Sequence, residues 1–144
     1  MQYSRALEII HELAFENQID EHDIAAGDKG LAGQAQWQSE ALDTLGDLLS
    51  NHHEAIDERF ALPKPEEIQA YPVEAVAADR AMSPSDPVSA IRISLDLSRS
   101  NLLDFDPDME ESYDEQQLAV SLVEDFIVRH GDALAASMTT IKLG

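Results

Sequence analysis

The sequence contains no cysteine, few basic residues and no apolar run of the roughly 18 residues that a membrane-spanning helix needs. The absence of cysteine excludes disulfides, thiolate metal sites and cysteine nucleophiles. Near the N-terminus, Glu8 and Glu12 interrupt the apolar positions, a pattern that does not match a signal peptide. We therefore expect a soluble, cytoplasmic protein that does not enter a membrane.

The scarcity of basic residues leaves the chain strongly acidic. Nine lysine and arginine residues stand against 29 aspartate and glutamate residues, which gives a formal net charge of -20 at pH 7. A charge of this sign repels the phosphates of nucleic acids and the headgroups of anionic membranes. Direct binding to either is not expected, and a basic protein is the partner that the charge favours.

The apolar residues that are present predict an all-α fold. Hydrophobic residues make up 44% of the 144 positions, enough for the core of a single domain over residues 1–144. They recur at helical spacing over residues 2–17 and again over 34–61, with a polar, glycine-rich loop predicted between 18 and 33. We predict a compact bundle of five or six helices with a long second helix, in which residues 1–62 form an N-terminal helical hairpin.

Prolines separate this hairpin from the C-terminal helices over 88–144. Five of the six prolines lie between 63 and 87, which predicts a proline-rich connector with at most a short helix over 73–82. Asp86 followed by Pro87 resembles an N-cap and a first helical residue, and it opens a helix from 88 onward. The alternation of Ile91, Ile93, Leu95 and Leu97 also matches a half-buried strand, but a lone strand has no partner in a helical chain.

The last third of the chain is predicted as an acidic loop followed by two helices. Residues 101–112 form the loop, and residues 113–130 form a broadly apolar helix that ends with Gly131 as its C-cap. Asp132 then caps a final helix.

Acidic side chains gather on one face of the long helix predicted over 34–61. At 100° per residue they fall within about 100° of arc, opposite the apolar residues. Over their length the helix advances about 27 Å, a distance over which one DNA strand carries about eight phosphates. The stripe consists of Glu40, Asp43, Asp47, Glu54, Asp57 and Glu58, and three residues of the first helix, Glu8, Glu12 and Glu16, extend it if the two helices pack side by side.

This stripe predicts an acidic helical protein-interaction module. As an inhibitor or regulator, it would occupy the basic groove of a nucleic-acid-binding enzyme or complex by mimicking the charge of nucleic acid. The alternative is that the stripe only keeps the protein solvated.

A second pattern, over residues 104–115, supplies oxygen ligands. Its carboxylates match ligand positions of the twelve-residue EF-hand calcium loop, although Met109 stands where that loop has its glycine. Calcium binding is therefore an alternative to a solvated acidic loop, with the ligands Asp104, Asp106, Asp108, Glu110 and Glu115.

A third pattern concerns Mg²⁺. The run Leu-Gly-Asp-Leu-Leu over residues 45–49 resembles a fragment of the MazG-like all-α nucleotide pyrophosphatases, whose helices present Glu-x-x-Glu and Glu-x-x-Asp pairs to Mg²⁺. Glu40 and Asp43 match the second pair, whereas His11 stands where a second glutamate would follow Glu8. The resemblance implies Mg²⁺-dependent hydrolysis of a nucleoside triphosphate as the alternative function.

The remaining candidate residues have simpler interpretations. No serine lies in a Gly-x-Ser-x-Gly elbow, and no catalytic residue is predicted. His53 and Asp57, four residues apart, are expected to make a surface contact. Trp37 is predicted to be a core or interface anchor, and the apolar residues from Leu31 to Trp37 offer a homodimer surface as an alternative.

Overall fold

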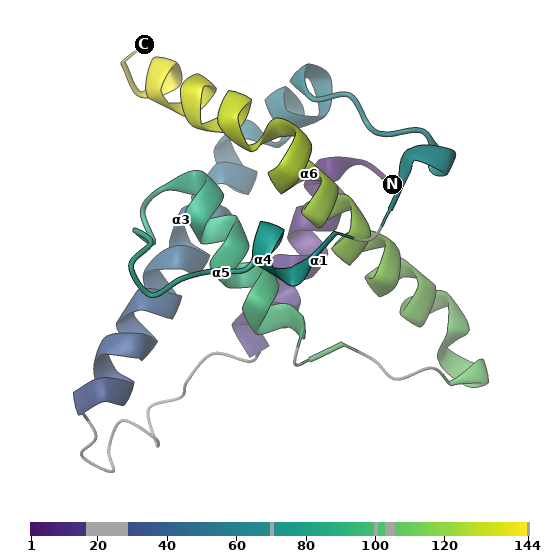
Figure 1. The fold of residues 1–144 in the computed structure, drawn as a ribbon, viewed down its shortest axis with the longest axis horizontal. Coiled ribbons are helices and arrows are strands. Elements are labelled where there is room, and N and C mark those ends of the chain that lie inside the picture. Colours follow the sequence, from purple (N-terminus) through teal and green to yellow (C-terminus); the bar gives the residue numbers. More distant parts are fainter. Residues whose placement is uncertain (17–28, 70, 100, 103–105, 144) are drawn as a thin grey trace.

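A computed structural model describes residues 1–16, 29–69, 71–99, 101–102 and 106–143, and within these ranges it describes all side chains except those of residues 29–32, 65, 73 and 137–143. This part of the chain contains five α-helices, two 3₁₀ turns and no strand, so the predicted all-α bundle is confirmed (Figure 1). The α-helices are α1 (Tyr3–Glu16), α3 (Lys29–Arg59), α4 (Val73–Val76), α5 (Pro87–Arg99) and α6 (Glu110–Leu143), and the 3₁₀ turns are η1 (Pro65–Glu67) and η2 (Pro107–Met109).

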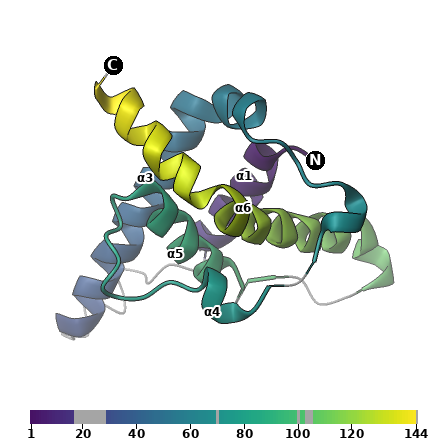
Figure 2. The same cartoon turned by 45° about the horizontal axis from the view of Figure 1, so that its top comes forward.

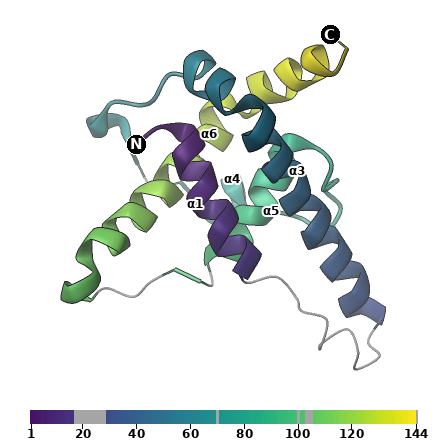
Figure 3. The same cartoon turned by 180° about the vertical axis from the view of Figure 1, so that it is seen from behind.

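Helix α1 lies at the centre of the bundle and packs against α3, α5 and α6 (Figure 3). Its apolar positions recur at helical spacing, so one broad face of the helix is buried in the main hydrophobic core. Burying each large aliphatic side chain there contributes about 1.5–3 kcal/mol to folding. The buried apolar residues of α1 are Tyr3, Ala6, Leu7, Ile9, Ile10, Leu13 and Ala14.

Helices α1 and α3 pack side by side in opposite directions. At the start of α1, the backbone N–H of Ser4 donates to Oδ1 of Asp57 at 3.0 Å, and its hydroxyl donates to Oδ2 at 2.6 Å. Further along, Nε2 of His11 lies 3.1 Å from the carbonyl oxygen of Leu42. A Cβ at Gly46 would lie 3.4 Å from the same nitrogen, so the two helices are in close contact here.

The connector between α3 and α5 packs against α6 and against α3. Its short helix α4 packs against α6 (Figure 2), and the chain then follows α3, where the indole N–H of Trp37 donates to the carbonyl of Met82 at 3.0 Å. The guanidinium of Arg80 lies 4.8 Å from the centre of the same indole ring. Trp37 is therefore an anchor for the connector, while the side chain of Leu31 lies outside the described part.

Helix α5 begins as predicted, because Oδ2 of Asp86 accepts a hydrogen bond from the backbone N–H of Ser89 at 3.0 Å. Of the alternating residues that also matched a strand, three are buried and Leu97 is partly buried, because α5 packs on both sides. Ile91 and Leu95 belong to the main core with α1 and α6, whereas Ile93 packs with residues of α3.

Three predicted boundaries are wrong. Helix α3 begins at Lys29, so residues 29–33 are helical and not part of a loop; residues 17–28 lie outside the described part. The predicted loop over 101–112 is helical from Pro107 onward. Helix α6, which is 34 residues long, continues through Gly131, so this glycine is not a C-cap. Burial of Leu134, which is 2% exposed, favours this continuation over the helix end that a glycine usually marks.

Replacing Gly131 with alanine is expected to raise the free energy of unfolding by about 0.5–1 kcal/mol, because glycine is a poor residue in a helix interior. The added Cβ would lie 3.7 Å from Cγ1 of Val88, an ordinary van der Waals contact. Urea denaturation measures the change. Gly33→Ala in α3, where a Cβ would meet nothing within 4 Å, is the control for helix propensity alone. Destabilisation by Gly131→Ala alone would contradict this account of the contact.

Candidate functional site: an acidic surface over α1 and α3

The exposed side of α3 carries most of the predicted acidic stripe. The opposite side of the helix is buried in the core through Leu45, Leu48 and Ile56. The carboxylates therefore project into solvent. None of these exposed carboxylates forms an ion pair with a lysine or arginine in the described part of the chain. The exposed members of the stripe are Glu40, Asp43, Asp47, Glu54 and Glu58.

Asp57 differs from the other residues of the stripe. It is half-buried, and both of its oxygens accept hydrogen bonds from Ser4 at the first turn of α1. A carboxylate at this position satisfies a free N–H of the helix and faces the positive end of its dipole. The expected contact with His53 is wrong, because Nδ1 of His53 lies 3.0 Å from the carbonyl oxygen of Leu49 and its Nε2 lies 4.0 Å from Oε1 of Glu54. Asp57 therefore joins the two helices.

The glutamates of α1 have different neighbours. Glu8 pairs with Arg5 at 3.2 Å, and Arg5 also reaches Glu115 of α6 at 3.0 Å. The hydrogen bond to Glu8 raises the pKa of Arg5, so this cation persists at every accessible pH. Glu12 and Glu16, in contrast, border a groove between α1 and α6. The first helix lies beside the second as the prediction required, but its three glutamates do not form one continuous extension of the stripe.

The calcium-binding pattern is not arranged as an EF-hand loop in the described residues. Oδ1 of Asp106 accepts from the backbone N–H of Asp108 at 3.0 Å and caps η2. Glu110 is the first residue of α6, and Glu115 pairs with Arg5. The helical start of α6 is the physical reason for the difference, because a helix spreads successive side chains around its axis. Asp104 lies outside the described residues.

The residues of the Mg²⁺ pattern likewise do not converge on one point, because they have different partners. Glu8 pairs with Arg5, and Oε1 of Glu40 accepts from Nε2 of Gln36 at 3.1 Å. His11 is directed at a backbone carbonyl of α3, and Asp43 is exposed. Across the described residues, no group of three or more histidine, aspartate or glutamate side chains has the geometry to hold a metal ion.

Sequence reasoning missed a buried polar network centred on Asp125, which is 1% exposed. Its Oδ2 accepts from the hydroxyl of Tyr3 at 2.6 Å, and its Oδ1 accepts from the hydroxyl of Tyr71 at 3.0 Å. Nε of Arg129 donates to the same Oδ1 at 3.2 Å, and Arg129 also pairs with Glu67 at 3.5 Å. The network thus joins α1 and α6 to the connector, which takes part through Glu67 of η1 and through Tyr71. An aspartate within the apolar pattern of α6, four residues before an arginine, was the available signal.

Electrostatics reinforces this network. Burial, followed by the hydrogen bond to Asp125, raises the pKa of Tyr3 well above its usual range, so the phenol stays protonated and remains a donor. The charge of Asp125 raises the pKa of Arg129. The network is structural, because its carboxylate is enclosed by its own partners.

Two further acidic side chains lie partly inside the protein near α5. Burial raises the pKa of Asp96, whose Oδ2 accepts from the backbone N–H of Ala78 at 2.9 Å. Burial also raises the pKa of Glu124, which lies 3.6 Å from Arg99. This pair is an ion pair without a hydrogen bond, since Nη2 and Nε of Arg99 are buried with no hydrogen-bond partner. These groups hold α5 to the connector and to α6.

Comparison of the chain with protein-family models, with curated protein sequences and with solved structures finds no match. Among the described residues, the helices are too short or too polar for any of them to cross a bilayer. The feature of the molecule that indicates a function is therefore its surface, a row of solvent-facing carboxylates on a helix that α1 and α5 hold in place.

Proposed function

We propose that this chain is a cytoplasmic interaction protein, a single helical domain whose α3 surface binds a basic protein. The favoured partner is a nucleic-acid-binding protein whose groove the acidic surface occupies, so that the chain acts as an inhibitor or regulator. The observation that carries the proposal is the row of five exposed carboxylates on α3 that have no lysine or arginine partner among the described residues. These are Glu40, Asp43, Asp47, Glu54 and Glu58.

The spacing of these carboxylates supports the proposal. Asp43 and Asp47 are one helical turn apart, as are Glu54 and Glu58, so the charges recur along one line of the helix. Because Asp57 accepts hydrogen bonds from Ser4, five carboxylates of the stripe remain available to a partner over about 27 Å. A DNA strand of that length carries about eight phosphates. The charge density is lower than that of DNA, and it has the same sign and a comparable extent.

The rigidity of the surface also supports the proposal. Helix α3 is held by α1 and α5, and the hydroxyl of Thr44 donates to the connector carbonyl of Pro84 at 2.8 Å. The positions of the charges are therefore set before a partner arrives, which lowers the entropy cost of binding. The net charge of -20 steers a basic partner toward the chain over a range that shortens as salt increases.

Reversing two central charges tests the proposal. We expect the chain to displace a fluorescent DNA duplex from a lysine-rich DNA-binding domain, and we expect Asp47→Lys combined with Glu54→Lys to weaken this competition about tenfold or more. Both side chains are exposed, so the melting temperature should stay unchanged. Fluorescence anisotropy at salt concentrations from about 0.05 to 0.2 M also measures the expected decrease in salt dependence.

The matched control places the same charge change elsewhere. Glu66 and Glu74 are exposed in the connector, and Glu66→Lys combined with Glu74→Lys alters the net charge equally. We expect this control to compete nearly as well as the unchanged protein. Equal losses in both double variants would show that only net charge matters, and no displacement by the unchanged protein at low salt would refute the proposal.

A further inference from the structure

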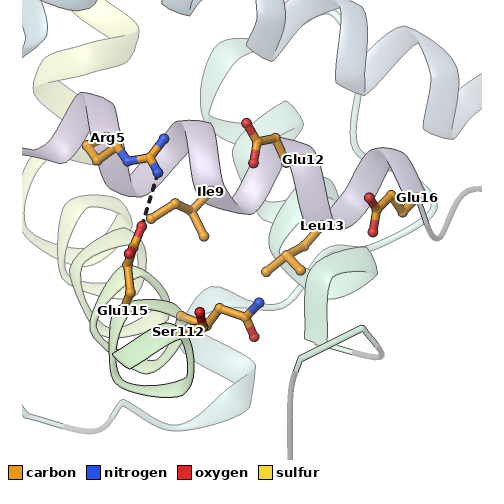
Figure 4. A pocket seen from close by; sticks show the side chains of 8 residues that line it. Arg5, Ile9, Glu12, Leu13, Glu16, Ser112 and Glu115 are labelled. Carbon is orange, nitrogen blue, oxygen red and sulfur yellow. Dashed lines mark hydrogen bonds and ion pairs between the residues drawn. The ribbon is translucent and has the colours of Figure 1, made fainter. Parts of the chain in front are cut away.

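A groove of about 270 Å³ lies between α1 and the first turns of α6. Figure 4 shows Ile9 and Leu13 pointing from α1 toward Ser112 of α6, with the Arg5–Glu115 ion pair at one end of the groove. Ile9 and Leu13 are 6% and 8% exposed, so they form an apolar floor and not an exposed patch. The groove combines a small apolar surface with a charged rim.

The rim of the groove has an excess of negative charge. Three glutamates border it, against the single cation of Arg5. Arg5 is already paired with Glu8 and Glu115, whereas Glu12 has no hydrogen bond or ion pair with the part of the chain that the structure describes. At the end away from Arg5, Oε2 of Glu16 accepts from the side-chain amide of Asn101 at 3.1 Å. The uncompensated charge therefore lies at Glu12 and Glu16, one turn apart on α1.

The size of the groove limits what it can hold. Pockets for drug-sized ligands span about 300–1,000 Å³, so this volume suits a fragment or a single side chain. The apolar floor and the acidic rim together match an alkyl chain that ends in a cation. Arginine has this chemistry, because its methylene stem packs on apolar surface while its planar guanidinium donates to carboxylates.

We infer that this groove binds an alkylguanidinium group, supplied in a complex by one arginine side chain of the basic partner, a source that rests on the function proposed above. The stem lies on Ile9 and Leu13, and the guanidinium donates to Glu12 and Glu16. Arginine is also among the residues that most often anchor protein interfaces in small pockets. The groove would thus add a specific contact to the long-range attraction of the α3 surface.

A titration with n-butylguanidinium tests the site without any protein partner. Methyl NMR is expected to show saturable shifts at Ile9 and Leu13 that fit one millimolar dissociation constant. Methylguanidinium has three methylenes fewer and should bind roughly 60-fold more weakly, since each buried methylene is worth about fourfold in affinity. Shifts spread evenly over the acidic side of α3, with no saturation at the groove, would mean counterion binding only and would overturn the inference.

Two variants separate the groove from general charge effects. Ser112→Trp places a large side chain in the groove from an exposed position and should abolish binding of n-butylguanidinium, whereas Ala133→Trp, at an exposed site on the same helix, should leave it unchanged. Glu12→Gln combined with Glu16→Gln should weaken binding about tenfold while keeping the shape of the groove. Unchanged binding in Ser112→Trp or in the double glutamine variant would overturn the inference.

The source of the guanidinium is tested by the DNA displacement assay with an arginine-rich DNA-binding domain as the partner. Ser112→Trp is expected to compete several-fold less well than Ala133→Trp, which would support an arginine of the partner as the occupant. Equal competition by these two variants would overturn that assignment. Saturable n-butylguanidinium binding by a chain that displaces no DNA would refute the proposed function while confirming the groove as a site for an alkylguanidinium ligand, so the two failures are distinguishable.

Discussion

Replacing Asp125 with alanine is expected to lower the free energy of unfolding by about 3–5 kcal/mol, the cost of breaking a buried charge network by removing one partner. The carboxylate is 1% exposed and accepts from Tyr3, Tyr71 and Arg129. Its removal leaves the Tyr3 hydroxyl buried without an acceptor, and an unsatisfied buried donor costs about 1–3 kcal/mol. It also frees the connector at Tyr71.

Urea denaturation followed by circular dichroism measures this effect. Asp132→Ala provides the matched control, because Asp132 lies on the same helix and is exposed, and it should change stability by less than about 0.5 kcal/mol. Asp125→Asn should lie between the two, since the amide oxygen still accepts from tyrosine but no longer pairs with the charge of Arg129. A loss below about 1 kcal/mol in Asp125→Ala would contradict the role of this network.

Truncation of Phe126 to alanine is expected to cost about 3–5 kcal/mol, the range for removing a buried aromatic side chain. Phe126 is 0% exposed, and its ring centroid lies 4.9 Å from that of Tyr3 and 5.2 Å from that of Phe60. The cavity would open where α1, α6 and the end of α3 meet. Contacts between such rings add about 0.5–1.5 kcal/mol beyond burial.

The control for Phe126→Ala is Val128→Ala on the same helix. Val128 is 46% exposed, so its truncation should change the free energy of unfolding by less than about 0.5 kcal/mol. Thermal and urea denaturation of both variants provide the comparison. Equal effects at the two positions would mean that the aromatic cluster contributes little to the fold.

Local patterns predicted most of the helices. The apolar spacing of α1 and α3 indicated both elements to within a few residues, because a helix that packs on a core repeats its buried positions every three or four residues. Asp86 and Pro87 marked the start of α5 for the same local reason. Gly131 misled the prediction, since glycine ends a helix only where tertiary packing does not reward its continuation.

The candidate site was predictable in part. The sequence indicated which side of α3 faces solvent, but it could not show that Asp57 is bound by Ser4, 53 residues away. It also could not show that Glu115 pairs with Arg5, 110 residues away. This ion pair forms one end of the groove. Asp104, the first residue of the calcium pattern, lies outside the described residues, whereas Asp106 and Glu115 are committed to a cap and an ion pair.

The sequence by itself determined the helical class, the acidic character and the solvent-facing row of carboxylates on α3, because periodicity and charge are properties of single segments. Only the tertiary structure decided which acidic groups have no lysine or arginine partner, which make internal hydrogen bonds or ion pairs, and which border a groove. The physical reason is that hydrogen bonds and ion pairs such as those of Asp57, Asp125 and Glu115 depend on the approach of distant segments. Helix spacing alone carries no information about that approach.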